Sequence, residues 1–162
     1  MNTKTKITIG FIGLSVLLCV VVSCVLFATA CMFKSKTTAE IMYSRWGIMI
    51  PDDMELLYHN STIGWPSDGE ECHVYKLKEE PIEFLEDFTT GRNEKAEEDI
   101  NRIIESFKSA KQEIPATYLI DFESEYRWKF VGKNEHDGRF ADYIYILYFP
   151  NLLQLSFFEY LM

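Results

Sequence analysis

The chain has 162 residues and a formal net charge of −9, and its charges are unevenly distributed. All 25 acidic residues lie from Glu40 onward, and 14 of the 16 basic residues lie from Lys34 onward, so residues 34–162 carry −11. This balance argues against nucleic-acid binding, because phosphate recognition needs clustered lysine and arginine side chains. Residues 34–162 are rich in aromatic side chains, which argues against disorder and predicts one independently folded, soluble acidic domain.

An apolar segment comes first along the chain. Residues 1–6 form a short polar tail, and residues 7–33 contain no charged side chain. A helix of about 20 apolar residues crosses a bilayer, so we expect residues 7–33 to form a transmembrane helix or uncleaved signal anchor in contact with membrane lipid. The short tail before it and the large domain after it favour a single-pass protein of the cell membrane whose domain lies outside the cytoplasm.

Two alternatives involve cleavage of this segment. Small residues precede Cys31, as they precede the lipidated cysteine of bacterial lipoproteins, and Cys24 fits the same loose pattern. Cleavage by signal peptidase after Ala30 would instead release a secreted domain. The apolar run is longer than the core of about 7–15 residues in a typical signal peptide, which favours the retained helix. All three alternatives place the domain at or beyond a membrane.

Hydrophobic periodicity in residues 34–162 predicts an α+β fold. The clearest element is an amphipathic helix over residues 94–111, with Asn93 as its N-cap and an apolar stripe formed by Ala96, Ile100, Ile103, Phe107 and Ala110. A short helix is expected after a cap at residues 37–38, with Gly47 placed to end it, and another at residues 81–88. The expected strands are 48–50, 54–58, 73–77, 118–122, 126–130, 143–149 and 153–162, with turns at 60–69 and 134–138. This order favours one mostly antiparallel sheet with the long helix packed across a face.

Residues 68–73 contain the densest set of potential metal ligands. Their spacing fits neither a calcium-binding EF-hand nor a zinc site, and the adjacent Cys72 and His73 point to opposite faces of a strand. The favoured interpretation is a tight turn that leads into a strand, so the sequence predicts no catalytic, cofactor-binding or metal-binding residue. The alternative is a small metal-dependent hydrolase that uses Asp68, Glu70 and His73.

Other candidate groups have weaker support. Cys72 could pair with His59, His73 or His136 as nucleophile and base, but no glycine-rich elbow accompanies it, and a half-buried strand cysteine is favoured. The carboxylates of Asp52, Asp53 and Asp137 fit solvated turns better than acid–base catalysis. Residues 60–62 form a glycosylation sequon. Trp65 is either a contact residue in an exposed loop or a side chain that closes one end of the sheet.

Several short segments together resemble small uncharacterised envelope proteins of Gram-positive bacteria: residues 47–51 (GIMIP), 55–58 (ELLY), 68–70 (DGE), 74–77 (VYKL) and a terminal tyrosine-rich hairpin. The resemblance implies a membrane-anchored or lipoprotein location in the envelope and no particular activity. The anchor, the acidic domain and the lack of a recognisable site favour a non-enzymatic interaction domain that binds another protein. The alternatives are a lipoprotein lipidated at Cys31 and the hydrolase described above.

Overall fold

The computed structural model describes residues 22, 37–64, 68–136 and 138–162. The chain divides into two compact units, Met1–Ile41 and Met42–Met162. The transmembrane helix expected at residues 7–33 lies outside the described residues apart from Val22, and so do Cys24, Cys31, Trp65 and Asp137. Among the described residues, no helix is both long enough and apolar enough to cross a membrane.

The helix α2 (Thr38–Trp46) starts and ends as the sequence predicts. The amide of Glu40 donates a hydrogen bond to Oγ1 of Thr37 at 3.2 Å, and the amide of Thr37 donates one to the Glu40 carboxylate at 2.8 Å. This reciprocal pair is a capping box, which satisfies two amides at the start of the helix. Gly47 ends the helix with a φ angle of +71°, which a glycine adopts without strain.

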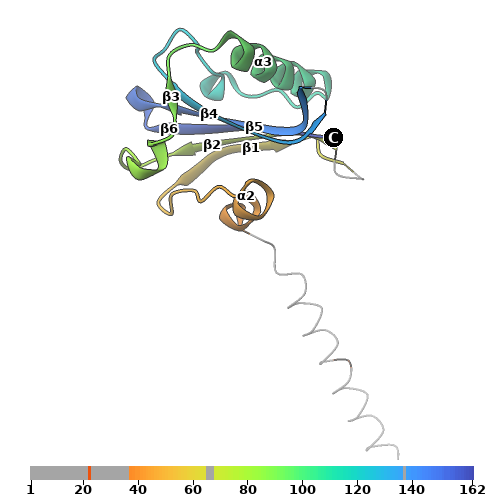
Figure 1. Ribbon diagram of the computed structural model, residues 1–162, viewed down its shortest axis with the longest axis horizontal. Coiled ribbons are helices and arrows are strands. Elements are labelled where there is room, and N and C mark those ends of the chain that lie inside the picture. The colour runs from red at the N-terminus through yellow and green to blue at the C-terminus, as the bar shows by residue number, and fades with distance from the viewer. Residues whose placement is uncertain (1–21, 23–36, 65–67, 137) are drawn as a thin grey trace, which may run out of the picture. The chain divides into compact units, whose positions relative to one another are not determined.

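Six strands form one antiparallel sheet in the order β1-β2-β6-β5-β4-β3 (Figure 1). The strands are β1 (Glu55–Ser61), β2 (Gly69–Lys76), β3 (Thr89–Thr90), β4 (Arg127–His136), β5 (Arg139–Phe149) and β6 (Gln154–Leu161). β6 is the last strand of the chain, yet it lies between β2 and β5, in the interior of the sheet. The predicted α+β fold with a mostly antiparallel sheet is confirmed.

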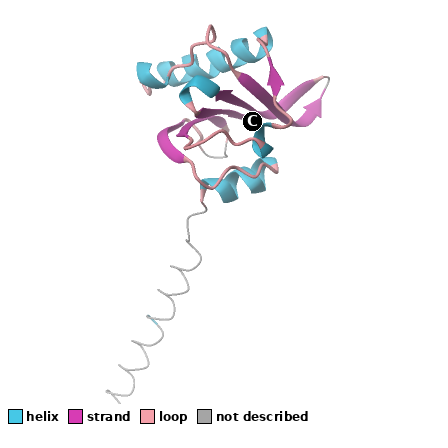
Figure 2. Ribbon diagram, turned by 90° about the vertical axis from the view of Figure 1, so that its left-hand side faces the viewer, coloured by secondary structure: helices cyan, strands magenta, loops and turns pink. Residues whose placement is uncertain are grey.

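One face of the sheet is covered by the long helix α3 (Glu94–Ser109), as Figure 2 shows. The amide of Ala96 donates to the side chain of Asn93 at 3.1 Å, so the predicted N-cap is confirmed. Four of the five residues predicted for the apolar stripe are buried, whereas Ala110 is exposed beyond the end of the helix. The stripe packs with side chains of one face of the sheet, among them Cys72, Val74, Leu147 and Phe158.

The opposite face carries a second hydrophobic core. Side chains alternate between the two faces of a strand, so the residues next to Val74, Leu147 and Phe158 point to this opposite face. Among them are Tyr75, Ile146 and Phe157. Met42 and Trp46 of α2 are buried in this core, together with Leu85 and Phe88 from the segment that precedes β3. The sheet therefore has an apolar layer on each side.

Three expected elements are wrong in their type. Residues 48–50 form no strand, because the amide of Ile48 is directed to the carbonyl of Met42 at the end of α2 and Pro51 has no amide hydrogen. The helix expected at 81–88 is reduced to a 3₁₀ turn, Glu83–Leu85, and Ile82 is exposed. Residues 118–122 alternate in polarity but follow the 3₁₀ turn Ala116–Tyr118 as a loop whose apolar side chains cover the edge of the α3 core.

Candidate functional site

An acidic groove of about 900 Å³ is the first candidate feature. Its walls come from residues 47–53 after α2, from residues 79–87 before β3, and from Lys129 on β4. Lys129 is the only basic side chain among the described residues that line it. The acidic lining residues are Asp53, Glu79, Glu80, Glu83, Glu86 and Asp87.

Most of this negative charge is uncompensated. Lys129 Nζ lies 2.6 Å from a carboxylate oxygen of Asp87, and Arg127 Nη1 lies 3.3 Å from one of Glu80. The other four carboxylates have no ion-pair partner within the described part of the chain. Met49 and Ile82, which are 78% and 72% exposed, add apolar surface to the same groove.

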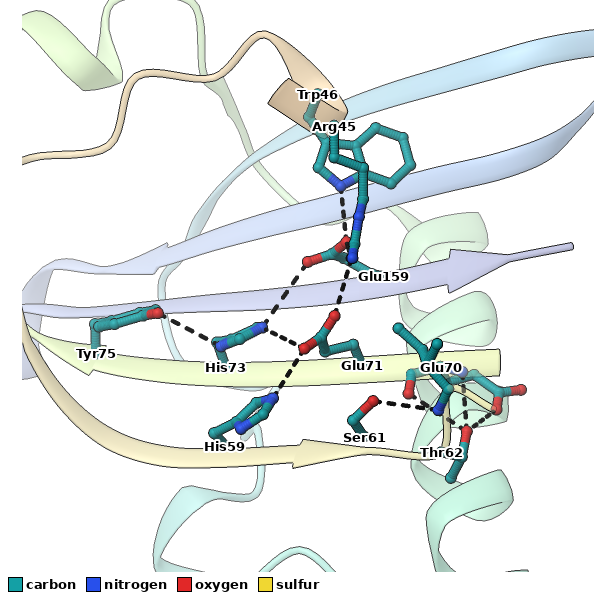
Figure 3. Close-up of polar contacts among 11 residues, drawn as sticks. Arg45, Trp46, His59, Ser61, Thr62, Glu70, Glu71, His73, Tyr75 and Glu159 are labelled. Atoms are coloured by element: carbon teal, nitrogen blue, oxygen red, sulfur yellow. Dashed lines mark hydrogen bonds and ion pairs between the residues drawn. The ribbon is translucent and has the colours of Figure 1, made fainter. Parts of the chain in front are cut away.

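A carboxylate–histidine cluster is the second candidate feature, and it lies on three adjacent strands (Figure 3). His59 on β1 pairs with His73 on β2, and Glu71 on β2 pairs with Glu159 on β6. Residues 71 and 73 are two positions apart, so their side chains leave the same face of the sheet, and the cross-strand partners share that face. The register of β1, β2 and β6 thus brings two imidazoles and two carboxylates together.

Residues from α2 hold both carboxylates. Arg45 Nη1 donates to Oε2 of Glu71 at 2.9 Å and to Oε2 of Glu159 at 2.6 Å. Trp46 Nε1 also donates to Oε2 of Glu159, at 2.8 Å. The side chain of Glu159 is fully buried, and its second oxygen, Oε1, has no hydrogen-bond partner among the described residues. A buried acceptor without a partner is uncommon and calls for an explanation.

The histidines face the inner oxygens of these carboxylates. Oε1 of Glu71 lies 2.9 Å from Nε2 of His59 and 3.2 Å from Nε2 of His73, and the two rings stack with centroids 4.4 Å apart. Burial raises the pKa of Glu71, but its hydrogen bonds with His73, Arg45 and His59 outweigh this effect and lower that pKa to about 2. Glu71 is therefore ionised at neutral pH. Imidazole nitrogens and carboxylate oxygens are the usual non-thiolate ligands of zinc-type ions.

The structure does not bring together the residues of the hydrolase hypothesis. The carboxylate of Glu70 accepts hydrogen bonds from Thr62 Oγ1 at 2.7 Å and from Ser106 Oγ of α3 at 2.9 Å. Glu70 thus points to the α3 side of β2, whereas His73 points to the opposite side. Asp68 is exposed and precedes the strand. The sequence predicts a turn that leads into a strand with His73 as its first residue, but β2 already starts at Gly69.

The nucleophile–base hypothesis fails for the same reason. Cys72 is fully buried in the α3 core, and burial raises the pKa of its thiol far above the usual range. His59 and His73 share the opposite face of the sheet. The side-chain amide of Asn60, the sequon residue, donates through Nδ2 to the backbone carbonyl of Gln112 at 2.8 Å. Asp53 lines the acidic groove, and Asp52 is an exposed turn residue.

The members of the cluster are dispersed in the sequence, so no local pattern reveals the cluster as a whole. His59 and His73 flank one hairpin loop, so a predicted register for this hairpin would have placed them opposite each other. Nothing local indicates that Glu159 joins them, since its position depends on the pairing of β6 with β2.

Comparisons of the chain with models of protein families, with curated proteins and with solved structures find no match. The function is therefore argued from the acidic groove and the carboxylate–histidine cluster themselves.

Proposed function

We propose that this protein is a membrane-anchored, non-enzymatic domain that binds a cationic, amphipathic segment of another protein through the acidic groove. The observation that supports this function best is the combination of uncompensated carboxylates and exposed apolar side chains in one groove. Single exposed apolar residues are normal on a protein surface. Met49 and Ile82 differ from such isolated residues because they line a groove whose carboxylates attract positively charged groups.

The chemistry of the groove favours a polypeptide partner. Lysine and arginine side chains spaced along an extended or helical segment can reach Asp53, Glu79, Glu83 and Glu86, which attract and orient it. Apolar side chains between those cations can cover Met49 and Ile82, and this contact adds affinity. Anionic lipid and nucleic acid are disfavoured, since their phosphates carry the same charge as the rim.

In this proposal residues 7–33 hold the domain at a bacterial cell membrane, with the acidic groove outside the cytoplasm. Attachment to the membrane confines the domain and its partner to the same layer, which raises their effective concentration. Lipidation at Cys31 would give the same location by a different attachment. The intact mass of the protein extracted from native membranes distinguishes the full-length chain from one that begins at Cys31 and carries lipid.

The test uses the full chain in nanodiscs of uncharged lipid and a fluorescent peptide of alternating lysine and leucine as the probe. We compare the triple substitution E79K/E83K/E86K in the groove with E113K/E125K/E135K, three exposed glutamates outside it. Both variants change the net charge equally, so a difference between them reports on the groove alone. We expect the groove variant to bind the probe at least about tenfold more weakly, and the control to change by less than about threefold.

The apolar part of the proposal has its own test. The substitution M49S/I82S leaves every charge in place and should weaken probe binding about tenfold or more, by removal of two apolar contacts. Equal losses in the two charge-reversal variants would show that the probe responds only to net charge. That outcome, or unchanged binding by M49S/I82S, contradicts the proposed function.

A further inference from the structure

The carboxylate–histidine cluster shares no residue with the acidic groove and has no role in the function proposed above. We propose that this cluster binds one divalent transition-metal ion of the zinc type. Three ligands, Nε2 of His59, Nε2 of His73 and Oε1 of Glu71, already lie within 4.8 Å of one another. Oε1 of Glu159 is the fourth ligand, and its side chain must move closer to the other three to complete the site. The site joins the hairpin of β1 and β2 with β6, which is adjacent to β2 in the sheet but distant from it in the sequence.

The spacing of the ligand atoms fits a single ion. In a tetrahedral site with bonds of about 2.0–2.1 Å, two ligand atoms lie about 3.3 Å apart. Oε1 of Glu71 lies 2.9 Å from Nε2 of His59 and 3.2 Å from Nε2 of His73. Oε1 of Glu159 lies 3.9 Å from Nε2 of His73. The first two distances are close to the tetrahedral edge, so the three atoms from His59, Glu71 and His73 are spaced for one ion, whereas Oε1 of Glu159 has to approach them.

The unsatisfied oxygen of Glu159 is an independent observation that points to a ligand. The side chain of Glu159 is fully buried, and its Oε1 faces His73 at 3.9 Å without a hydrogen bond (Figure 3). A bound cation would satisfy this lone pair, which no described protein donor does. The cluster holds two carboxylates against the single guanidinium of Arg45, a balance that favours the entry of a cation.

The surroundings of the cluster resemble the outer shell of a metal site, in which hydrogen bonds orient the ligands. Arg45 and Trp46 bind the outer oxygens of the carboxylates, so the inner oxygens remain directed to the histidines. The hydroxyl of Tyr75 lies 3.4 Å from Nδ1 of His73, the nitrogen that would not bind the metal. This arrangement leaves Nε2 of His73 for coordination.

The ligand set also indicates the kind of ion and its role. Two imidazoles favour zinc and similar transition metals over calcium and magnesium, which prefer oxygen ligands. Four protein ligands fill a tetrahedral shell and leave no position for substrate, which is typical of a structural site. The two rings now stack at an interplanar angle of 19°, so they must turn for both lone pairs to meet one ion.

The experiment measures zinc binding by the full chain in non-ionic detergent. The protein is first stripped with a chelator and then titrated with Zn²⁺ in competition with a chromogenic chelator. The variant H59A removes a ligand whose side chain is 44% exposed on an edge strand, so the fold should persist. The matched control is H136A, an exposed histidine at the end of β4. Zinc binding by cysteines contributes equally to both variants.

We expect H59A to bind Zn²⁺ at least about tenfold more weakly than the unchanged chain, and H136A to differ from it by less than about threefold. Zinc should also raise the melting temperature of the unchanged chain and of H136A, but not that of H59A, because only an intact site stabilises the folded state. Equal zinc affinity in the unchanged chain and H59A overturns the proposal. Absence of micromolar zinc binding by the stripped, unchanged chain overturns it as well.

Discussion

Nη1 of Arg45 lies 2.6 Å from Oε2 of Glu159, although the two residues are 114 positions apart in the sequence. This ion pair connects α2 with the interior strand β6. Because Glu159 is fully buried, its charge depends on Arg45 and on the indole of Trp46. Loss of one partner of a buried ion pair is strongly destabilising, since it leaves an uncompensated charge in the interior.

We therefore predict that R45M lowers the free energy of unfolding by about 3 kcal/mol. Denaturant titration of the full chain in detergent, followed by circular dichroism, measures this loss. The control is R92M, because Arg92 is 55% exposed and pairs with Glu97 and Glu123 at the surface. Solvent screens pairs at the surface, so R92M should cost much less than R45M, and an equal loss in the two variants would contradict the role given to Arg45.

The second prediction concerns truncation of the interior strand β6 at the C-terminal end of the chain. Deletion of residues 158–162 removes half of β6, which pairs with both β2 and β5, and removes the buried Phe158 and Glu159. We predict that the truncated chain does not fold, because the sheet is split at its interior. Limited proteolysis checks this, with deletion of the exposed Met162 alone as the control. Equal protease resistance of both truncations and the intact chain would refute it.

Cys72 should be unreactive in the native protein. Its side chain is fully buried in the α3 core, and burial raises the pKa of the thiol, so neither access nor ionisation favours modification. We predict that the rate at which a maleimide modifies Cys72 is lower by a factor of about 100 or more in the folded chain than in the denatured chain, because modification of the folded chain requires local opening. Mass spectrometry of the peptide that contains Cys72 measures both rates. Rapid modification under native conditions would mean that this core is open to solvent.

The start of α3 should give a specific pH dependence. The hydrogen bonds from Arg92 lower the pKa of Glu97, burial opposes this shift, and the hydroxyl of Tyr126 supports it. A carboxyl whose pKa is lower in the folded state stabilises the protein above its unfolded pKa of about 4.3, and this contribution is lost as the pH falls through the folded pKa.

We predict that E97Q costs about 1 kcal/mol at pH 7, and that its difference from the unchanged chain shrinks as the pH falls below about 4. Denaturant titrations at pH 7 and in that acidic range provide the two values. E113Q, at an exposed glutamate outside the helix, should cost little at either pH. If E97Q lowers the free energy of unfolding equally at both pH values, the ionised form of Glu97 contributes nothing to stability.

Local signals in the sequence predict the elements whose local preferences agree with their tertiary contacts. The helix α3 has a cap at Asn93, a 3.6-residue apolar stripe and charges that suit its ends, and the structure contains it with a shift of two residues at its end. Residues 118–122 show where such signals fail. Their alternating apolar side chains suit a strand, yet they cover the edge of the α3 core as a loop, and alternation alone does not distinguish the two.

The two candidate sites were beyond sequence analysis for a different reason. His59, Glu71 and Glu159 become neighbours only through the register of three strands, and Arg45 reaches them from a helix. The acidic groove combines residues before β1, residues before β3 and Lys129 of β4. Five of the nine residues 79–87 are acidic, so the sequence shows this charge, but only the fold places it beside Asp53 and the exposed Met49 in one groove.

The central claim is that the acidic groove binds another protein at the membrane, and site-specific photo-crosslinking in native membranes tests it most directly. The photoreactive residue p-benzoylphenylalanine replaces Ile82 in the groove or, as a control, Leu152, which is 53% exposed outside it. We predict a discrete protein adduct from position 82 that E79K/E83K/E86K abolishes, and none from position 152. No adduct from position 82, or the same adducts from both positions, would contradict the claim.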